Sequence, residues 1–381
     1  FDDITMASAA WSITGAPVEV VTPYISGDLR ALRFEQSADV LYIAHRLYAP
    51  RKLQRLTATS FQLSLINFLP TPSFEVNFKP VATLTLSAVT GSGITGTTSV
   101  AVWLDGDVGR QVVSGAGRAT VKSITSSTIA VLDVLDDFAS VGPIASQSWQ
   151  MEGSPNAGTL TPGAAGPEGK VTTFTASVAT FRSTDVGSLL YGNAGCAKIT
   201  VFTSSTVVNA EILRPFTNVT AIAAGLWPLE SASWSATLGF PGVVSLDAQR
   251  LWWGGSTNFP DSVWGSVVGD YENHAKGPAD DDAVDFPLAL SGVNLIRWMK
   301  SMSGLMVGSV AAEISLSRSD DAPLATANPP AVKTRTKEGA DNTVDAIATS
   351  SAILFLQRGA QRIQELAFDP TTVEISYVAV D

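Results

Sequence analysis

Two segments of this chain repeat one another at a distance of 78 residues without a gap. Residues 107–138 and 185–216 both carry Asp-Val-Gly, Ala-Gly and Thr-Ser-Ser-Thr at the same places, and the match extends upstream to Trp103 and Phe181. A gapless match of this length indicates a duplicated module rather than chance similarity in a sequence rich in Ser, Thr and Val. The sequence therefore predicts two tandem copies of one fold in the middle of the chain.

The hydrophobic pattern predicts that these modules, and most of the chain, consist of strands. Apolar and polar residues alternate in residues 83–86, from the 120s to Val134, and in residues 171–181, as on half-buried strands. Turn residues recur roughly every ten positions, and we expect Asp-Val-Gly to form a turn and Thr-Ser-Ser-Thr a hairpin tip in each module. Helical spacing after a Ser26 cap predicts one short helix within residues 26–37. The expected fold class is all-β.

The composition fits a protein with large permanent contacts. Charged residues make up only 15% of the chain, whereas hydrophobic residues reach 45%, and Ser, Thr, Ala and Gly fill the deficit of charge. A polar surface made of hydroxyl groups suits permanent interfaces because hydroxyls cost less to desolvate than charges. An ordinary secreted β protein has a similar profile, so this observation leaves both classes of protein open.

The net charge bears on nucleic-acid binding. The formal net charge is −11, and the longest run of Lys and Arg is the pair Arg51-Lys52. Binding DNA through its phosphates requires a basic patch, so the sequence argues against sequence-specific DNA recognition. An acidic wall would instead let duplex DNA slide past with weak attraction.

The sequence offers little for a cofactor or metal site. One cysteine, Cys196, excludes an internal disulfide framework and a Cys-based zinc site, and the histidines His45 and His274 are far apart. We therefore expect neither cofactor nor metal. His45 has no nucleophile motif beside it, which favours a structural role over that of a general base. Since no apolar run approaches ~18 residues, we also expect no stable membrane insertion.

The stretch from Gly239 to His274 combines turns with two short aromatic strands. A Gly-Phe-Pro-Gly turn opens an apolar strand, Gln-Arg leads into Leu-Trp-Trp, and an Asn-Phe-Pro-Asp turn precedes the strand around Trp264. This pattern is typical of a hairpin in a propeller blade or a sandwich. The neighbours Trp252 and Trp253 point to opposite faces of a strand, so we expect them in a core or an interface rather than stacked on a glycan.

The order of these features resembles the nozzle proteins of short-tailed bacteriophages, also called tail tubular protein B or tail hub. Other segments resemble the same family in the same order, and the likeness covers the two ends of the chain better than the region between Lys79 and Phe240. These segments are residues 22–24, 32–42, 45, 50–53, 280–286, 294–298, 305–308, 354–359 and 363–366.

For the fold, the resemblance implies a β-propeller interrupted by inserted domains. We expect residues 1–80 and 239–381 to form the propeller, and residues 81–158 and 159–238 to form two tandem β-sandwich-like modules. At roughly 40–45 residues per four-stranded blade, the outer segments allow about five blades. The residue pattern by itself also allows a sandwich there, because blade repeats are not evident.

For the function, the resemblance implies a structural virion protein and not an enzyme. Proteins of this family form a homo-hexameric ring below the tail adaptor protein, which lies under the portal. The ring attaches tail fibres or spikes and encloses the channel through which double-stranded DNA is ejected, without sequence-specific binding. The expected location is the phage tail of the virion, after assembly in the cytoplasm of the bacterial host.

Four aspartates form the strongest acidic cluster of the sequence. A calcium loop needs alternating ligands, a Gly and a distal Glu, and these aspartates do not follow that spacing. A solvated loop is the simplest interpretation, and a lumen-facing acidic ring is the functional one. The residues are Asp280, Asp281, Asp282 and Asp285.

Two Gln-Arg pairs, at residues 249–250 and 357–358, lie where strands are expected to end. Arg250 and Arg358 can fork onto carboxylates between strands or subunits. We expect structural ion pairs there, within the protein or at a subunit interface, rather than phosphate contacts.

Two other classes of function stay open. One is a carbohydrate-binding or carbohydrate-cleaving β-propeller, secreted or carried on a phage tail, that uses Asp281 or Asp285 for catalysis and tryptophans as glycan platforms. The other is a non-enzymatic adhesin built from Ig-like modules, for which the 78-residue repeat is the main support. Neither predicts a six-fold ring around a channel.

Overall fold

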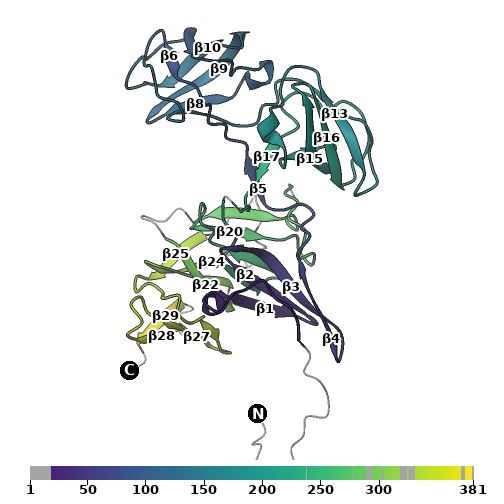
Figure 1. Cartoon of the computed structure of the whole chain (residues 1–381). Helices are drawn as coiled ribbons and strands as arrows, with labels where there is room; N and C mark the ends of the chain where they lie inside the picture. Colours follow the sequence, from purple (N-terminus) through teal and green to yellow (C-terminus); the bar gives the residue numbers. More distant parts are fainter. Residues whose placement is uncertain are drawn as a thin grey trace, which may run out of the picture. The chain divides into compact units, whose positions relative to one another are not determined.

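The chain divides into two compact units, which we describe separately. The computed structural model describes residues 19–236, 238–277, 279–288, 294–302, 304–317, 324, 331–369 and 374–379. Unit 1 comprises Phe1–Asn67, Ala236–Gly269 and Asp285–Asp381, and unit 2 comprises Phe68–Ser235 and Asp270–Val284. Both units are built almost entirely from antiparallel strands (Figure 1), so the all-β prediction is confirmed.

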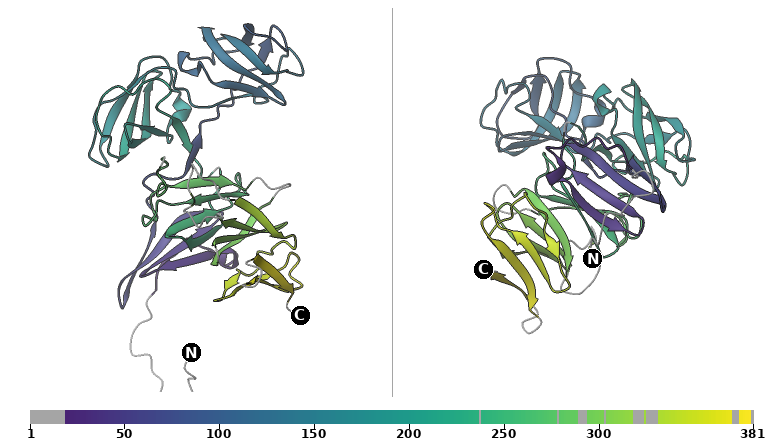
Figure 2. Two further views of the ribbon diagram at one scale, coloured as in Figure 1. Left: turned by 180° about the vertical axis from the view of Figure 1, so that it is seen from behind. Right: turned by 60° about the horizontal axis from the view of Figure 1, so that its bottom comes forward.

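The strands from β1 to β4 and from β18 to β29 form four antiparallel sheets of four strands, and each sheet keeps its strands in chain order. The first sheet, whose purple strands lie side by side in Figure 2, contains β1 (Arg33–Ser37), β2 (Val40–His45), β3 (Tyr48–Thr57) and β4 (Ser60–Leu65). The second contains β18 (Val243–Asp247), β19 (Arg250–Gly254), β20 (Ser262–Gly265) and β21 (Val284–Pro287). The third contains β22 (Ile296–Met302), β23 (Gly304–Ser309), β24 (Glu313–Ser317) and β25 (Ala331–Thr336). The fourth contains β26 (Ile347–Ala348), β27 (Ala352–Leu356), β28 (Ile363–Asp369) and β29 (Glu374–Ala379).

The first strand of each of these sheets contacts the neighbouring sheets of unit 1. Strand β18 contacts β1, β2 and β22, and β22 also contacts β26 and β27. Buried apolar side chains lie between the third and fourth sheets, where Trp298 of β22 packs on Phe355 of β27 with ring centroids 5.4 Å apart. The sheets therefore meet through the strands that begin them.

Two expectations for unit 1 need correction. The helix expected within residues 26–37 is present only as the three-residue 3-10 helix Leu29–Ala31, and β1 begins at Arg33. Leu29 is about half exposed, so its helical spacing to Leu32 does not mark a buried face. We also expected about five blades from the length of the outer segments, whereas the described residues form four four-stranded sheets there.

Unit 2 contains two larger sheets with equivalent strand orders. The first has the order β11-β8-β9-β10-β7-β6, and the second, read in the corresponding direction, has β5-β17-β14-β15-β16-β13-β12. The strands of the first are β6 (Leu84–Leu86), β7 (Ile94–Thr98), β8 (Gln111–Ser114), β9 (Gly117–Ser126), β10 (Ile129–Asp136) and β11 (Gln150–Glu152). Those of the second are β5 (Ser73–Glu75), β12 (Leu160–Pro162), β13 (Val171–Ala176), β14 (Leu189–Gly192), β15 (Gly195–Ser204), β16 (Val207–Arg214) and β17 (Leu229–Ala232). We call β6–β11 and the loops between them module 1, and β12–β17 with their loops module 2.

The two modules pair their strands at the same offset of 78 residues that the sequence repeats. In module 1, Leu132 faces Val121 across β10 and β9, and in module 2, Ala210 faces Ile199 across β16 and β15. The irregular pairings of these two hairpins also fall at equivalent positions. The two segments therefore adopt one fold twice.

A glycine–phenylalanine contact shows why the modules keep certain residues. A Cβ placed on Gly117 would lie 2.8 Å from the Cα of Phe138, and one on Gly195 would lie 2.7 Å from the Cα of Phe216. Each phenylalanine is buried in the core of its own module. Since real Cβ atoms do not approach backbone this closely, the fold requires glycine at both positions.

Within the described part of the chain, we find no helix with the length and hydrophobicity needed to cross a membrane.

Candidate functional site

The acidic residues singled out in the sequence occupy a loop and the strand that follows it. Asp280 and Asp281 are exposed, whereas Asp282 is partly buried. The Asp282 carboxylate accepts a hydrogen bond of 2.9 Å from the backbone N–H of Ala279, which holds the loop in a turn. Asp285 lies in β21 and is partly buried. Among the described residues, no group of three or more His, Cys, Asp or Glu side chains is placed to hold a metal ion.

The two predicted strand-end arginines have different environments. Arg250 begins β19, is 1% exposed, and donates to the carbonyl oxygens of Ser266 at 2.5 Å and Leu324 at 3.2 Å. Arg358 is exposed in the turn after β27, next to Gly359. Arg250 therefore joins two backbone segments inside unit 1. Of the two arginines, Arg358 is the one that is accessible to another molecule.

The tryptophans of the aromatic stretch are buried, as expected for core residues. Trp252 and Trp253 have no exposed surface, and Trp264 is almost fully buried. The indole N–H of Trp252 donates to the carbonyl of Asp247 at 3.2 Å. These rings are not available as stacking platforms for a sugar.

The single cysteine and His45 have no reactive character in this fold. Cys196 is buried, and burial raises the pKa of its thiol to about 12. Burial also lowers the pKa of His45, whose Nδ1 accepts a hydrogen bond of 3.2 Å from the N–H of Leu47. At pH 7 the thiol is protonated and the imidazole is neutral.

A cluster of charged and polar side chains lies where the first strands of unit 1 meet, and we call it the carboxylate cluster. Its Lys300 ammonium is 3.1 Å from the carboxylate of Asp345, and the Ser301 hydroxyl donates to Asp247 at 2.6 Å. Burial raises the pKa of Glu35 and of Asp247. These residues come from β1, β18, β22 and the segment just before β26.

A second polar site, which we call the arginine pocket, lies nearer the beginnings of the same segments. It is a cavity of about 240 Å³ lined by Arg33, Arg46 and Arg297, together with residues that include Asp28 and Gly242. Arg33 begins β1, Arg46 lies in the turn after β2, and Arg297 is in β22. The pocket therefore gathers cations from segments that are more than two hundred residues apart.

The two sites are stacked along the same strands. Strand β1 contributes Arg33 to the arginine pocket and Glu35, two residues later, to the carboxylate cluster. Strand β22 contributes Arg297 to the pocket and Lys300 to the cluster in the same order. In both β1 and β22, the residue that lines the arginine pocket therefore precedes the residue that belongs to the carboxylate cluster.

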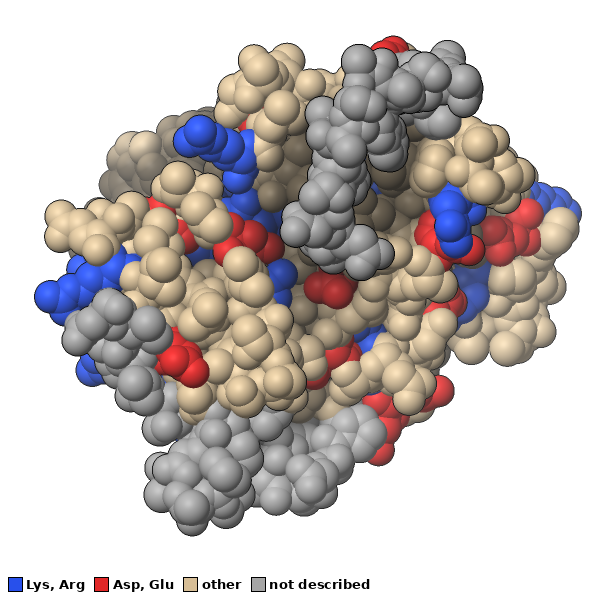
Figure 3. Space-filling model, turned by 90° about the horizontal axis from the view of Figure 1, so that it is seen from below, with Lys and Arg blue, Asp and Glu red and all other residues tan. Residues whose placement is uncertain are grey.

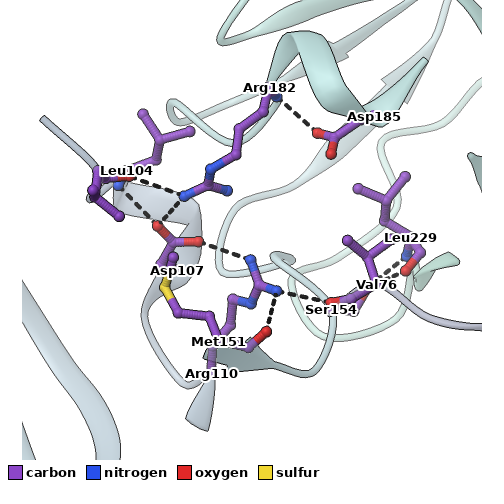
Figure 4. A network of polar contacts seen from close by, with 10 residues as sticks. Val76, Leu104, Asp107, Arg110, Met151, Ser154, Arg182, Asp185 and Leu229 are labelled. Atoms are coloured by element: carbon purple, nitrogen blue, oxygen red, sulfur yellow. Dashed lines mark hydrogen bonds and ion pairs between the residues drawn. The ribbon is translucent and has the colours of Figure 1, made fainter. Parts of the chain in front are cut away.

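The two modules of unit 2 are joined by a buried ionic network (Figure 4). The fully buried carboxylate of Asp107 contacts Arg110 of its own module at 3.1 Å and Arg182 of module 2 at 2.5 Å. Arg110 also donates to the carbonyls of Val76 at 2.8 Å and Met151 at 3.1 Å. Because a buried charge without its partner is costly, this network fixes how the modules contact each other.

A further cluster of polar side chains joins the segments at which the chain enters and leaves unit 2. The Ser73 hydroxyl of β5 donates to Glu230 of β17 at 2.5 Å, and the Lys276 ammonium lies 3.2 Å from the same carboxylate. Phe68, Trp234 and His274 pack edge to face beside this crossing, with ring centroids 5.1 to 5.7 Å apart. The three chain segments that bound unit 2 are therefore held together by both polar and aromatic contacts.

Comparison with known proteins adds no family to this picture. No model of a known protein family matches the chain, and a search of curated proteins finds no match to it.

Sequence reasoning did not identify the arginine pocket. Neither Arg33 nor Arg297 stands in a basic run or a motif. These arginines come together because of which sheets are neighbours in the fold, and no local sequence pattern contains that information. The acidic loop, by contrast, was visible as a run of carboxylates.

Proposed function

We propose that this chain is a structural virion protein, the nozzle of a short bacteriophage tail. In this proposal, a homo-hexameric ring of the chain sits below the tail adaptor protein, anchors fibres or spikes, and encloses the channel for double-stranded DNA. The chain performs no turnover chemistry. The ordered set of segments that resemble the nozzle family is the starting point for this assignment.

The observation that carries the proposal is the series of four consecutive four-stranded meanders in unit 1. We infer that these sheets are the blades of a β-propeller, because neighbouring sheets contact one another through the strands that begin them. The chain leaves after the first meander, completes the tandem modules, and returns for the second. An interrupted propeller with inserted modules is the organisation that the resemblance implies.

The charge distribution supports a passive conduit rather than a DNA-binding protein. The net charge is −11. Figure 3 shows acidic and basic side chains interspersed among uncharged ones on the face it draws, with no continuous basic field outside the grey atoms. Such a surface lacks the phosphate-neutralising patch that tight DNA binding needs. DNA can then move along it without being retained.

The burial of the aromatic residues favours this proposal over the carbohydrate alternative. Trp252, Trp253 and Trp264 are the rings that the alternative requires as platforms, and all three are inside unit 1. Asp280 and Asp281, the other part of the stretch on which that alternative draws, are exposed in a loop.

The copy number of the chain in purified particles tests the proposal. Quantitative mass spectrometry should compare the amount of this chain with that of the portal protein. If the portal has twelve subunits, the particles should contain half as many copies of this chain, which corresponds to one hexamer per tail. The same particles should not depolymerise host polysaccharide through this chain. A copy number other than six per tail, or a chain that is absent from particles, contradicts the proposal.

A further inference from the structure

The arginine pocket contains a guanidinium that has no hydrogen-bond acceptor. Arg297 is partly buried, and the structure places no hydrogen bond or ion pair on it among the described residues; its Nε is buried and unsatisfied. A guanidinium has five N–H donors and cannot lose its charge at neutral pH. Buried donors without acceptors are rare in native proteins and call for an explanation, such as a bound ion.

The other two arginines direct their donors mainly to neutral groups. Arg33, which is 5% exposed, donates to the carbonyl of Asn342 at 2.8 Å, and Arg46 donates to the carbonyl of Gly255 at 3.3 Å and to that of Ile296. Carbonyl oxygens satisfy the donors but carry no full negative charge, so they do not neutralise the guanidiniums.

The acidic groups around the pocket are largely committed elsewhere. Asp28 lines the pocket, and its carboxylate already accepts a hydrogen bond of 2.7 Å from the Tyr48 hydroxyl. Asp345 lies 3.4 Å from Arg33 but is shared with Lys300 at 3.1 Å. Among the lining residues, three guanidiniums face the one carboxylate of Asp28, and Asp345 and Asp341 offset part of this positive charge from outside the lining.

The effect of placing these arginines close together is seen in the pKa of Arg46. Burial, together with the charges of Arg297 and Arg33, lowers the pKa of Arg46 to about 10. Burial likewise lowers the pKa of Arg297, with Asp341 opposing and Arg33 adding to the effect. The cations thus repel one another within this cavity, and an anion would relieve the repulsion.

The dimensions of the pocket limit what can bind. A volume of about 240 Å³ lies below the range of roughly 300–1,000 Å³ that is usual for drug-sized ligands. Glycine at position 242 makes room for Arg46, because a Cβ there would lie 2.5 Å from the Arg46 Nε. The space suits a small anion, and several guanidiniums in fork geometry match a multiply charged oxyanion better than a single carboxylate.

We propose that the arginine pocket is a binding site for a small phosphate-class oxyanion, held by Arg33, Arg46 and Arg297 where the four sheets of unit 1 begin. Arg297 supplies the free donors, and the other two arginines supply charge from fixed positions. The bound anion would join β1, the turn after β2 and β22, and so would stabilise unit 1. This site does not depend on the nozzle proposal.

Inorganic phosphate is the probe for the test, applied to the full chain at constant ionic strength adjusted with chloride. Isothermal titration calorimetry should detect binding to the wild-type chain, and Arg297→Met should weaken it by about ten- to a hundredfold, the effect of one charge-assisted hydrogen-bonding group. Arg297→Lys, which keeps the charge but not the fork, should fall in between. The matched control is Arg55→Met, since Arg55 lies in β3 of the same unit and pairs with Asp39 outside the pocket; its affinity should equal that of the wild type.

Thermal unfolding gives a second readout that a purely structural arginine would not produce. Phosphate should raise the midpoint temperature of the wild type and of Arg55→Met but not that of Arg297→Met. Without phosphate, Arg297→Met should unfold no earlier than the wild type, because it loses a repulsive charge. The proposal is overturned if phosphate does not bind, if Arg297→Met binds it as tightly as the wild type, or if chloride produces the same effect. Binding of a duplex oligonucleotide that requires Arg297, with no binding of free phosphate, would overturn it in favour of a DNA-backbone contact.

Discussion

Modules 1 and 2 share one fold but differ at the positions that join them. Both keep the glycine–phenylalanine contact, and both bury a tryptophan whose indole N–H donates to a loop carbonyl, Trp149 to Ala82 at 2.8 Å and Trp227 to Gly158 at 2.7 Å. Both also end a 3-10 turn with a buried aspartate. These shared features are the ones each module needs to fold by itself.

The differences lie around the two aspartates. Asp107 has Arg110 three residues later, whereas the corresponding position after Asp185 is Ser188. Leu104 of module 1 corresponds to Arg182 of module 2, and the Arg182 guanidinium reaches back to Asp107 and lies 4.5 Å from the centre of the Phe78 ring. The repeated residues therefore maintain the fold, whereas the diverged Arg182 couples module 2 to Asp107 of module 1 and the diverged Arg110 holds the same carboxylate from within module 1.

The largest loss of stability is expected from removing the Arg110 side chain. Arg110→Met removes the side-chain donor from the carbonyl of Val76 and one of two donors from that of Met151, and it weakens the pairing of a fully buried carboxylate. We expect a loss of about 3–5 kcal/mol of module 1 stability, measured as faster amide hydrogen exchange in β8–β10. Ser188→Ala, at the equivalent site of module 2, should change local stability by less than about 0.5 kcal/mol. Equal effects of the two substitutions would remove the distinction between fold and coupling residues.

The second-largest loss of stability, which follows from substituting the two glycines, should be equal in the two modules. Gly117→Val and Gly195→Val both force a side chain against the backbone of a buried phenylalanine, which we expect to cost about 3 kcal/mol. Hydrogen exchange should show each loss mainly in the module that carries the substitution. A loss confined to one of the two variants would show that the glycines are not equivalent.

The indole hydrogen bonds should give a smaller, matched pair of losses. Trp149→Phe and Trp227→Phe each leave a buried loop carbonyl unsatisfied, which costs about 1–3 kcal/mol. Urea unfolding followed by circular dichroism should give values for the two variants within about 0.5 kcal/mol of each other, as expected for independent equivalent sites.

The smallest change in stability is expected at Asp185, with a sign opposite to that at Asp107. Burial raises the pKa of Asp185, although the N–H of Arg182 donates to its carboxylate at 2.7 Å. A raised pKa means that the folded state favours the protonated form, so this group becomes less destabilising as the pH falls through its folded pKa. Asp185→Asn should therefore stabilise the chain slightly at pH 7, by less than about 1 kcal/mol, and the gain should disappear in acid.

Asp107→Asn should instead destabilise at pH 7, because it leaves Arg110 and Arg182 facing a neutral group in the interior. Urea unfolding of both variants between pH 4 and pH 7.5 measures the two signs. A stabilising Asp107→Asn would contradict the role of this network.

The parts of the fold that local sequence predicts are those whose residues interact within one module or one hairpin. The 78-residue offset is also the offset of the strand registers, and the opposed neighbours Trp252 and Trp253 are both core residues. The helical spacing around Leu29 corresponds to only a three-residue 3-10 helix, because the residues of that helix are not buried against the rest of the fold.

The parts that sequence did not predict depend on contacts between distant segments. Arg250 reads as a strand-end residue able to reach a partner, yet it is buried against the carbonyls of Ser266 and Leu324. Arg33, Arg46 and Arg297 acquire a common role only when the beginnings of four sheets meet. Neither fact follows from periodicity or from a motif, because both depend on which sheets are neighbours.

Cryo-electron microscopy of the particle that carries this chain tests the central claim most directly. The account predicts six copies of the chain around an axial channel at the end of the tail, with unit 1 seen as a propeller of four-stranded blades. Density for the chain at the tips of peripheral appendages, or without six-fold symmetry, would contradict it.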